Sequence, residues 1–70
     1  MIPLSLAEAG KEQMIRKVGG SPETRMHLKD LGFVVGGTIT VINTLHGNVI
    51  VKVKESRIAL NDELARKIMV

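Results

Sequence analysis

Glycine and threonine crowd one stretch of the chain, a composition that is typical of phosphate-binding loops. Gly32, Gly36 and Gly37 stand close together, and Thr38 follows them directly. A phosphate loop runs from a strand through its glycines into a helix, because the amides at the helix N-terminus bind the anion. Here we expect the opposite order, from helix to glycines to strand, and no lysine adjoins the threonine. We therefore interpret these glycines as turn residues and not as a nucleotide site.

A metal site on a helix is the second candidate. Glu23, His27 and Asp30 follow one another at spacings of four and three residues, which places them on one face of a predicted helix. Carboxylate and imidazole groups in such a triad could hold zinc or iron. The alternative is a solvated helix face on which glutamate and histidine form a weak exposed pair. We favour the solvated face and expect no bound metal.

No candidate nucleophile of the chain has the neighbouring base that catalysis would need. Ser5, Ser21 and Ser56 have a local structural role or none, and neither His27 nor His46 has an evident serine and aspartate beside it. Nucleophilic catalysis needs a base next to the nucleophile and a third group that orients the base. We expect no enzyme activity, no catalytic residue and no cofactor.

Basic side chains near the C-terminus indicate a different class of function. Lys52, Lys54 and Arg57 could line one strand face, and small β-barrels bind RNA and DNA through such faces. Base recognition also uses aromatic side chains for stacking, and Phe33 is the only aromatic residue of the chain. A nucleic-acid-binding barrel is therefore the alternative hypothesis, while we expect no nucleic-acid partner.

The overall composition is typical of one small domain, which we expect to span residues 1–70. Without cysteine, such a short chain depends on apolar packing, and 44% of its residues are hydrophobic. Ten lysines and arginines against seven acids give a net charge of +3, with no block of one sign. No signal peptide and no apolar run long enough to span a bilayer is present. We expect a cytoplasmic protein that does not insert into membranes.

One helix is indicated in the first half of the chain, over roughly residues 22–31. Ser21 is a candidate N-cap, and Pro22 suits the first helical position. Gly32 stands where a left-handed residue would end the helix. Helical capping signals are therefore present at both ends of this segment.

The segment before this helix is expected to form a helical turn and then a strand. Ser5 and Glu8 have the spacing of a capping box. Residues 11–18 follow as a strand, but Ile15 and Val18 break strict alternation. Either one of these two side chains points outward, or a bulge resets the register.

Alternating apolar residues predict a β-hairpin over residues 37–54. A three-residue loop over 45–47, with Gly47 left-handed, would pair Thr44 with Asn48. Two further short strands, "SRIAL" and "RKIMV", complete the set. Strands this short cannot bury their faces as an open sheet. We therefore predict an all-β fold, a small barrel of about five short strands with one short helix.

The same hairpin register has a consequence for binding. It pairs Val41 with Val51 on the inner face and Ile42 with Ile50 on the outer face. An exposed isoleucine pair is either an ordinary cross-strand contact or a contact patch for another protein. Ile42 and Ile50 are therefore the candidate partner-binding residues.

The order of these motifs resembles that of the FeoA family, small cytoplasmic accessory proteins of ferrous-iron uptake. "LSLAEAG" is similar to the opening of the family pattern and "HLKDLGFVVGGTI" to its central signature, while "VIVKV" followed by "RIALNDELARKIMV" resembles its C-terminal block. The matching positions are Leu28, Leu31, Gly32, Phe33, Gly36, Ile39, Ile58, Ala59, Leu60, Ala65, Ile68 and Val70. The chain departs from the pattern at His27, at Val35 and at Glu55 and Ser56.

This resemblance implies an SH3-like barrel and a protein partner. The implied partner is FeoB, a membrane Fe²⁺ transporter with a cytoplasmic GTP-binding domain. On this basis we expect a non-enzymatic accessory protein that binds the cytoplasmic part of FeoB and modulates Fe²⁺ transport. The sequence leaves open whether the chain also associates with itself.

Overall fold

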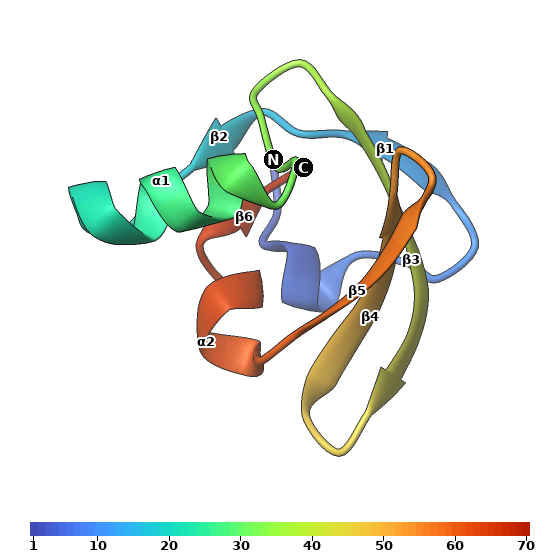
Figure 1. Cartoon of the computed structure of the whole chain (residues 1–70). Helices are drawn as coiled ribbons and strands as arrows, with labels where there is room; N and C mark the ends of the chain where they lie inside the picture. The colour runs from blue at the N-terminus through green and yellow to red at the C-terminus, as the bar shows by residue number, and fades with distance from the viewer.

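Short antiparallel strands dominate the chain, which a computed structural model describes over residues 1–70 (Figure 1). In chain order the elements are η1 (Leu4–Leu6), β1 (Glu12–Met14), β2 (Lys17–Val18), α1 (Pro22–Asp30), β3 (Thr38–Leu45), β4 (Asn48–Val53), β5 (Ser56–Leu60), α2 (Asp62–Ala65) and β6 (Ile68–Met69). One sheet has four strands in the order β1-β3-β4-β5, and the other pairs β2 with β6. The predicted all-β fold is confirmed, with six strands where about five were expected.

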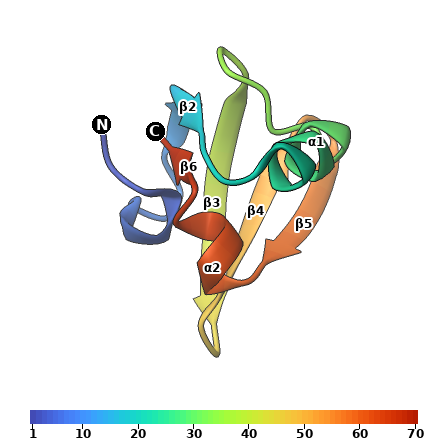
Figure 2. The same cartoon turned by 90° about the vertical axis from the view of Figure 1, so that its left-hand side faces the viewer.

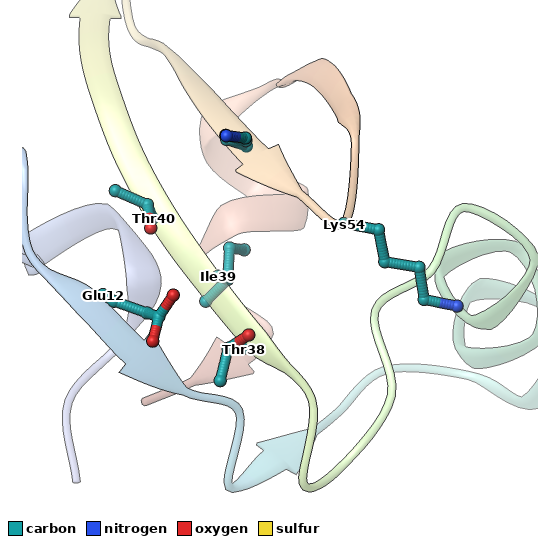
Figure 3. A pocket seen from close by; sticks show the side chains of 6 residues that line it. Glu12, Thr38, Ile39, Thr40 and Lys54 are labelled. Atoms are coloured by element: carbon teal, nitrogen blue, oxygen red, sulfur yellow. The ribbon is translucent and has the colours of Figure 1, made fainter.

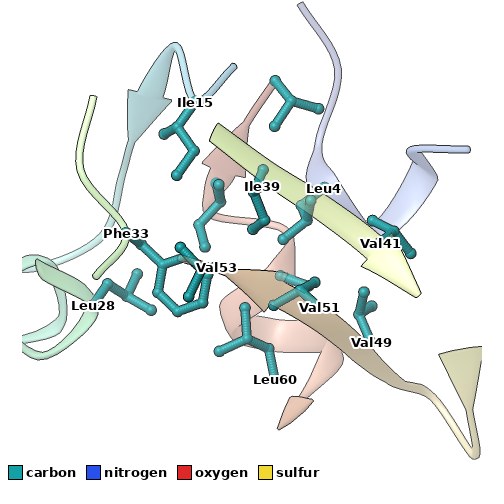
Figure 4. Packing of buried hydrophobic residues seen from close by; sticks show 13 residues of the cluster. Leu4, Ile15, Leu28, Phe33, Ile39, Val41, Val49, Val51, Val53 and Leu60 are labelled. Carbon is teal, nitrogen blue, oxygen red and sulfur yellow. The ribbon is translucent and has the colours of Figure 1, made fainter. Parts of the chain in front are cut away.

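The two sheets share one apolar core (Figure 4). Its 13 buried residues are all hydrophobic, and no polar or charged residue is buried. They are Leu4, Ile15, Leu28, Phe33, Ile39, Val41, Val49, Val51, Val53, Leu60, Ala65, Ile68 and Val70. Because no polar or charged residue is buried, the side chains of the core interact by apolar packing alone, as expected for a chain without cysteine.

Ile15 marks the corner at which the chain passes from one sheet to the other. Its amide donates to the carbonyl of Gly37 and its carbonyl accepts from the amide of Gly36, both at 2.8 Å. The expected single strand over 11–18 is therefore two strands, β1 paired with β3 and β2 paired with β6. Ile15 is buried and Val18 packs against the core. The irregular spacing of Ile15 and Val18 is therefore explained by a corner between two sheets, and not by an outward side chain or a bulge.

Helix α1 begins at the predicted residue, Pro22, and ends at Asp30, one residue before the predicted end. The Ser21 hydroxyl accepts a hydrogen bond from the Thr24 amide at 3.2 Å, which confirms the N-cap. At the other end, the amides of Gly32 and Phe33 donate to the carbonyls of Lys29 and Leu28, both at 2.9 Å. This pair of bonds, with φ +104 at Gly32, is a Schellman motif. It turns the chain so that Phe33 enters the core.

The turn at the N-terminus differs from the prediction. Residues Leu4–Leu6 form a 3₁₀ turn that follows Pro3, and no side chain caps it. Ser5 lies inside this turn, so the expected capping box with Glu8 does not form. The turn is instead fixed by burial of Leu4 in the core.

The β3–β4 hairpin also differs from the prediction, and the difference affects the candidate site. His46 and Gly47 both have positive φ, at 52 and 81, and Leu45 pairs with Asn48. This is a two-residue loop with the positive φ values of a type I′ turn, in place of the expected three-residue loop.

A shift of register in β3 compensates for the shorter loop. Asn43 pairs with Ile50, and the ladder then shifts so that Val41 pairs with Val51 as predicted. Ile42 is the extra residue of this bulge, so the expected Ile42–Ile50 and Thr44–Asn48 pairs are wrong. The bulge keeps the valines of β4 on the core side although the loop is one residue shorter.

The two chain ends lie next to each other beside the two-stranded sheet (Figures 1 and 2). Ile2 and Val70 exchange backbone hydrogen bonds of 2.9 and 2.8 Å, and Pro3 forms a bridge to Met69. Helix α2, capped by the Asn61 side chain, contacts β4, β5 and η1. These contacts close the apolar core at this end of the molecule.

Candidate functional site

The four-stranded sheet buries one face and leaves the other open. Ile39, Val41, Val51 and Val53 point into the core, so their neighbours along the strands point outward. We call the outward set the open sheet face, and cross-strand pairing defines its members: Glu12, Met14, Thr38, Thr40, Asn43, Ile50, Lys52, Arg57 and Ala59.

A polar hollow of about 160 Å³ lies in the open sheet face (Figure 3). It is lined by Glu12, Thr38, Ile39, Thr40, Lys52 and Lys54. Figure 3 shows the Glu12 side chain directed toward Thr38 and Thr40, while Lys54 extends from the end of β4. The lining of the hollow therefore combines hydroxyl, carboxylate and lysine side chains, although the ammonium end of Lys54 is directed away from Glu12 (Figure 3).

Two of the three predicted basic residues, Lys52 and Lys54, line this hollow, and Arg57 is not part of its lining. Lys52 lies directly opposite Arg57 across β4 and β5, and Lys54 stands in the turn between these strands. The ion pairs of the chain lie elsewhere and join Arg66 to Asp62 and Lys67 to Glu63. The three basic side chains of the sheet thus have no acidic partner within the chain. No aromatic ring stands beside them, because Phe33 is buried.

Apolar side chains are exposed at the other end of the same face, near the β3–β4 turn. Ile42 is 37% exposed and Leu45 51% exposed, while Ile50 is half-buried. We call these three residues the hairpin patch. Ile42 and Asn43 together oppose Ile50, as the two residues of a bulge oppose one residue of the neighbouring strand. The two candidate isoleucines are therefore neighbours across the bulge and not a direct pair.

The residues of the predicted helix triad are not assembled into a metal site. Glu23, His27 and Asp30 all lie exposed on α1. No group of three histidine, cysteine, aspartate or glutamate side chains in the chain could hold a metal ion. Helical spacing alone places side chains on one face, but binding a metal needs their donor atoms to converge on one point.

The glycines of the suspected phosphate loop use their amides within the chain. The Gly36 amide donates to Ile15 at 2.8 Å, and the Gly37 amide donates to Val34 at 3.0 Å. These amides form the corner of the fold and are not free to bind an anion. The interpretation of these glycines as turn residues agrees with this geometry.

A second hollow, of about 310 Å³, was not predicted from the sequence, and we call it the apolar groove. It is lined by Val18, Arg25, Lys29, Phe33, Val34 and Val35, and its lining is mainly apolar. Val35 is 66% exposed at its rim. The only local signal is the apolar run "FVV" directly after the helix, and the hollow forms because Val18 of β2 and the Arg25 and Lys29 side chains of α1 border this run in the folded chain.

Helices capable of spanning a membrane are absent from this structure. What the fold offers is a small antiparallel barrel with a polar hollow, a hairpin patch and an apolar groove at its surface. Such a molecule belongs to the class of small, mostly β domains. Within this class the chain belongs to the FeoA family, because the FeoA domain model matches residues 2–70.

Individual relatives agree with this assignment. A protein of Methanocaldococcus jannaschii named as Fe(2+) transport protein A is 36% identical over 70 residues, which is 100% of this chain and 85% of that protein. The crystal structure of an iron uptake regulatory protein, FeoA, is similar with a TM-score of 0.87 at 28% identity, over 96% of this chain and 89% of the other.

The fold is also that of the FeoA protein from Stenotrophomonas maltophilia, which is described as a prokaryotic SH3 domain protein and was solved in complex with zinc. That similarity has a TM-score of 0.84 at 20% identity, over 99% of this chain and 88% of the other, and concerns the fold alone. The predicted SH3-like barrel is thereby confirmed. The FeoA family is a family of iron-transport accessory proteins and not of enzymes.

Proposed function

We propose that this protein is a cytoplasmic, non-enzymatic accessory protein of ferrous-iron uptake that binds the cytoplasmic part of FeoB and modulates Fe²⁺ transport. Membership of the FeoA family supports the connection to iron transport. The observation that carries the binding role is the hairpin patch, Ile42, Leu45 and Ile50, on a sheet face that is open to solvent.

The hairpin patch has the physical properties of a small contact surface. Isolated exposed apolar residues are common, but these three gather on one hairpin whose inner face is packed in the core. The hairpin backbone is fixed by the ladder to β4, so the patch loses little conformational entropy on binding. Burying it against a partner would gain roughly 25 cal/mol per Å² of apolar surface.

Substitution of the two isoleucines tests the proposal. Ile42→Asp combined with Ile50→Asp places two charges in the patch without touching the core. We expect the affinity for the purified cytoplasmic part of FeoB to fall at least about tenfold, or 1.4 kcal/mol, in isothermal titration calorimetry. Circular dichroism should show an unchanged fold, since neither isoleucine belongs to the buried core.

Val35→Asp is the matched control, because it adds one charge at an exposed valine in the apolar groove and away from the hairpin. We expect this variant to bind FeoB as the unmodified protein does. Undiminished affinity in the double isoleucine variant would remove the hairpin patch as the contact surface. Absence of binding by the unmodified protein would contradict the proposed function itself.

A further inference from the structure

The open sheet face carries positive charge that the chain does not neutralise. Lys52 and Arg57 lie directly opposite each other on neighbouring strands, an arrangement of like charges that disfavours the sheet. Neither forms an ion pair, and neither does Lys54 in the adjoining turn. Two acids are near, Glu12 in the wall of the hollow and Glu55 in the turn, so the local balance is three basic groups to two acidic ones. A bound anion would relieve the repulsion between Lys52 and Arg57.

The hollow beside these cations offers hydrogen-bond donors as well as charge. The Thr38 and Thr40 side chains line it, and neither takes part in a side-chain hydrogen bond of the chain. A hydroxyl and an ammonium group converging from β3 and β4 are suitable donors for a carboxylate. A volume of about 160 Å³ accommodates one such group and not an extended ligand.

The backbone at Lys54 is the second, independent observation. Lys54 has φ 56, a conformation that glycine or asparagine adopts at low cost and lysine does not. The turn therefore holds a lysine where a glycine would be more stable. Strained residues cluster at functional sites, and Lys54 is one of the residues that line the hollow.

Strand β4 contributes one residue to the hairpin patch and one to the hollow, and the spacing between these two residues is defined. Ile50 and Lys52 are two residues apart on β4 and point to the same face, which separates their side chains by about 7 Å. An extended segment lying along β4 would match this spacing with an apolar residue and an acidic residue two positions apart. The sheet thus specifies both the chemistry and the order of a segment that could bind to it.

We propose that the hollow, with Lys52, Lys54 and Arg57 around it, binds the carboxylate of an acidic segment of the protein partner whose apolar side chain contacts the hairpin patch. This proposal rests on the proposed function, in which the partner is the cytoplasmic part of FeoB. A peptide fits better than a nucleic acid because no aromatic ring is exposed for stacking. The Glu12 carboxylate repels any anion in the hollow, and a single carboxylate meets less of this repulsion than a run of phosphates.

Single substitutions separate the hollow from the rest of the surface. Lys52→Gln removes one cation from the hollow, and Lys17→Gln removes an exposed strand lysine from the other sheet as a control. We expect Lys52→Gln to weaken binding of the FeoB cytoplasmic part about three- to tenfold at 50 mM NaCl. The difference should disappear at 500 mM, where salt screens the charge. Lys17→Gln should bind as the unmodified protein does.

Lys54→Gly tests the strained residue with two readouts that move in opposite directions. The substitution relieves the positive φ, so the melting temperature should rise, while the affinity for the FeoB fragment should fall as it does in Lys52→Gln. A lower melting temperature would show that lysine is not strained here. Unchanged affinity in both Lys52→Gln and Lys54→Gly would overturn the proposal, although the proposed function would stand if the isoleucine double variant still lost binding.

A model peptide tests the recognition without FeoB. The probe is a nine-residue extended peptide with isoleucine and glutamate two positions apart, and its counterpart has glutamine in place of glutamate. In NMR titrations we expect the amide signals of Thr38, Thr40 and Lys52 to shift with the glutamate peptide and at least threefold less with the glutamine peptide. Equal shifts with both peptides would overturn the proposal. So would tighter binding of a twelve-nucleotide single-stranded DNA at the same residues, which would favour the nucleic-acid alternative.

Discussion

Gly32 shows at the residue scale how one backbone angle determines a residue type. Its φ of +104 allows the two hydrogen bonds that end α1 and turn Phe33 into the core. A Cβ at this position would meet only Val53, at ordinary contact distances of 3.7 and 3.8 Å. The glycine is therefore required by the left-handed backbone and not by lack of space.

Gly32→Ala should destabilise the protein by about 1 kcal/mol and lower its melting temperature by about 4–8 °C. Gly19→Ala is the control, because the Gly19 backbone is not left-handed and an added Cβ would lie 3.5 Å from the Lys67 carbonyl oxygen, an ordinary contact. Thermal unfolding followed by circular dichroism measures both. Equal melting temperatures for the two variants would contradict the role given to the Gly32 backbone.

Residues that signal local structure were predictable from the sequence where one local interaction decides the conformation. Ser21 caps the start of the helix and Gly32 follows its end, both as predicted, because capping depends on a few neighbouring backbone groups. Ser5 and Glu8 have an equally good local pattern but form no capping box. There the burial of Leu4 determines where the turn lies, and burial depends on parts of the chain that are distant in sequence.

The β3–β4 hairpin shows at the element scale how turn and register are coupled. The two-residue turn at His46 and Gly47 would shift every side chain of β3 by one position if the ladder were regular. The bulge at Ile42 absorbs that shift and leaves Ile42 without a cross-strand partner. The exposed isoleucine of the hairpin patch is thus a consequence of the turn type.

Substitution of His46 tests this coupling. Asparagine tolerates positive φ better than histidine and is preferred in type I′ turns, whereas alanine does not favour this conformation. We expect His46→Asn to raise the melting temperature by about 2–4 °C and His46→Ala to lower it by a similar amount. The opposite order in thermal unfolding would contradict the assigned turn.

Alternation along the strands predicted the basic residues of the candidate site but not the apolar groove. Lys52, Lys54 and Arg57 come together because strand periodicity and hairpin pairing are local properties. The groove at Val34 and Val35 could not be predicted, since α1 and β2 reach it only in the folded chain. Gly47 is left-handed as predicted, but the positive φ of His46 had no clear signal, because His-Gly is not one of the dipeptides typical of type I′ turns.

At the scale of the whole molecule, two sheets depend on one small core. Ile15 joins them, since it is fully buried and its backbone bonds to the glycine corner before β3. With no buried polar residue and no disulfide, the chain has no other source of specific stability in its interior. Loss of packing at Ile15 therefore affects both sheets together.

Ile15→Ala should destabilise the protein by about 2–5 kcal/mol, a large part of the stability of a domain of this size. Urea unfolding should remain a single transition that has the same midpoint by circular dichroism and by NMR signals of both sheets. Two separate transitions would contradict the single shared core.

The whole molecule is proposed to act through FeoB, and Fe²⁺ uptake measures this most directly. FeoB would be reconstituted in liposomes, and the initial rate of Fe²⁺ uptake followed with no addition, with the unmodified protein, and with the Ile42→Asp, Ile50→Asp double variant. We predict that the unmodified protein changes the rate and that the double variant leaves it as it is without addition. An uptake rate that is the same with and without the unmodified protein would contradict the central claim.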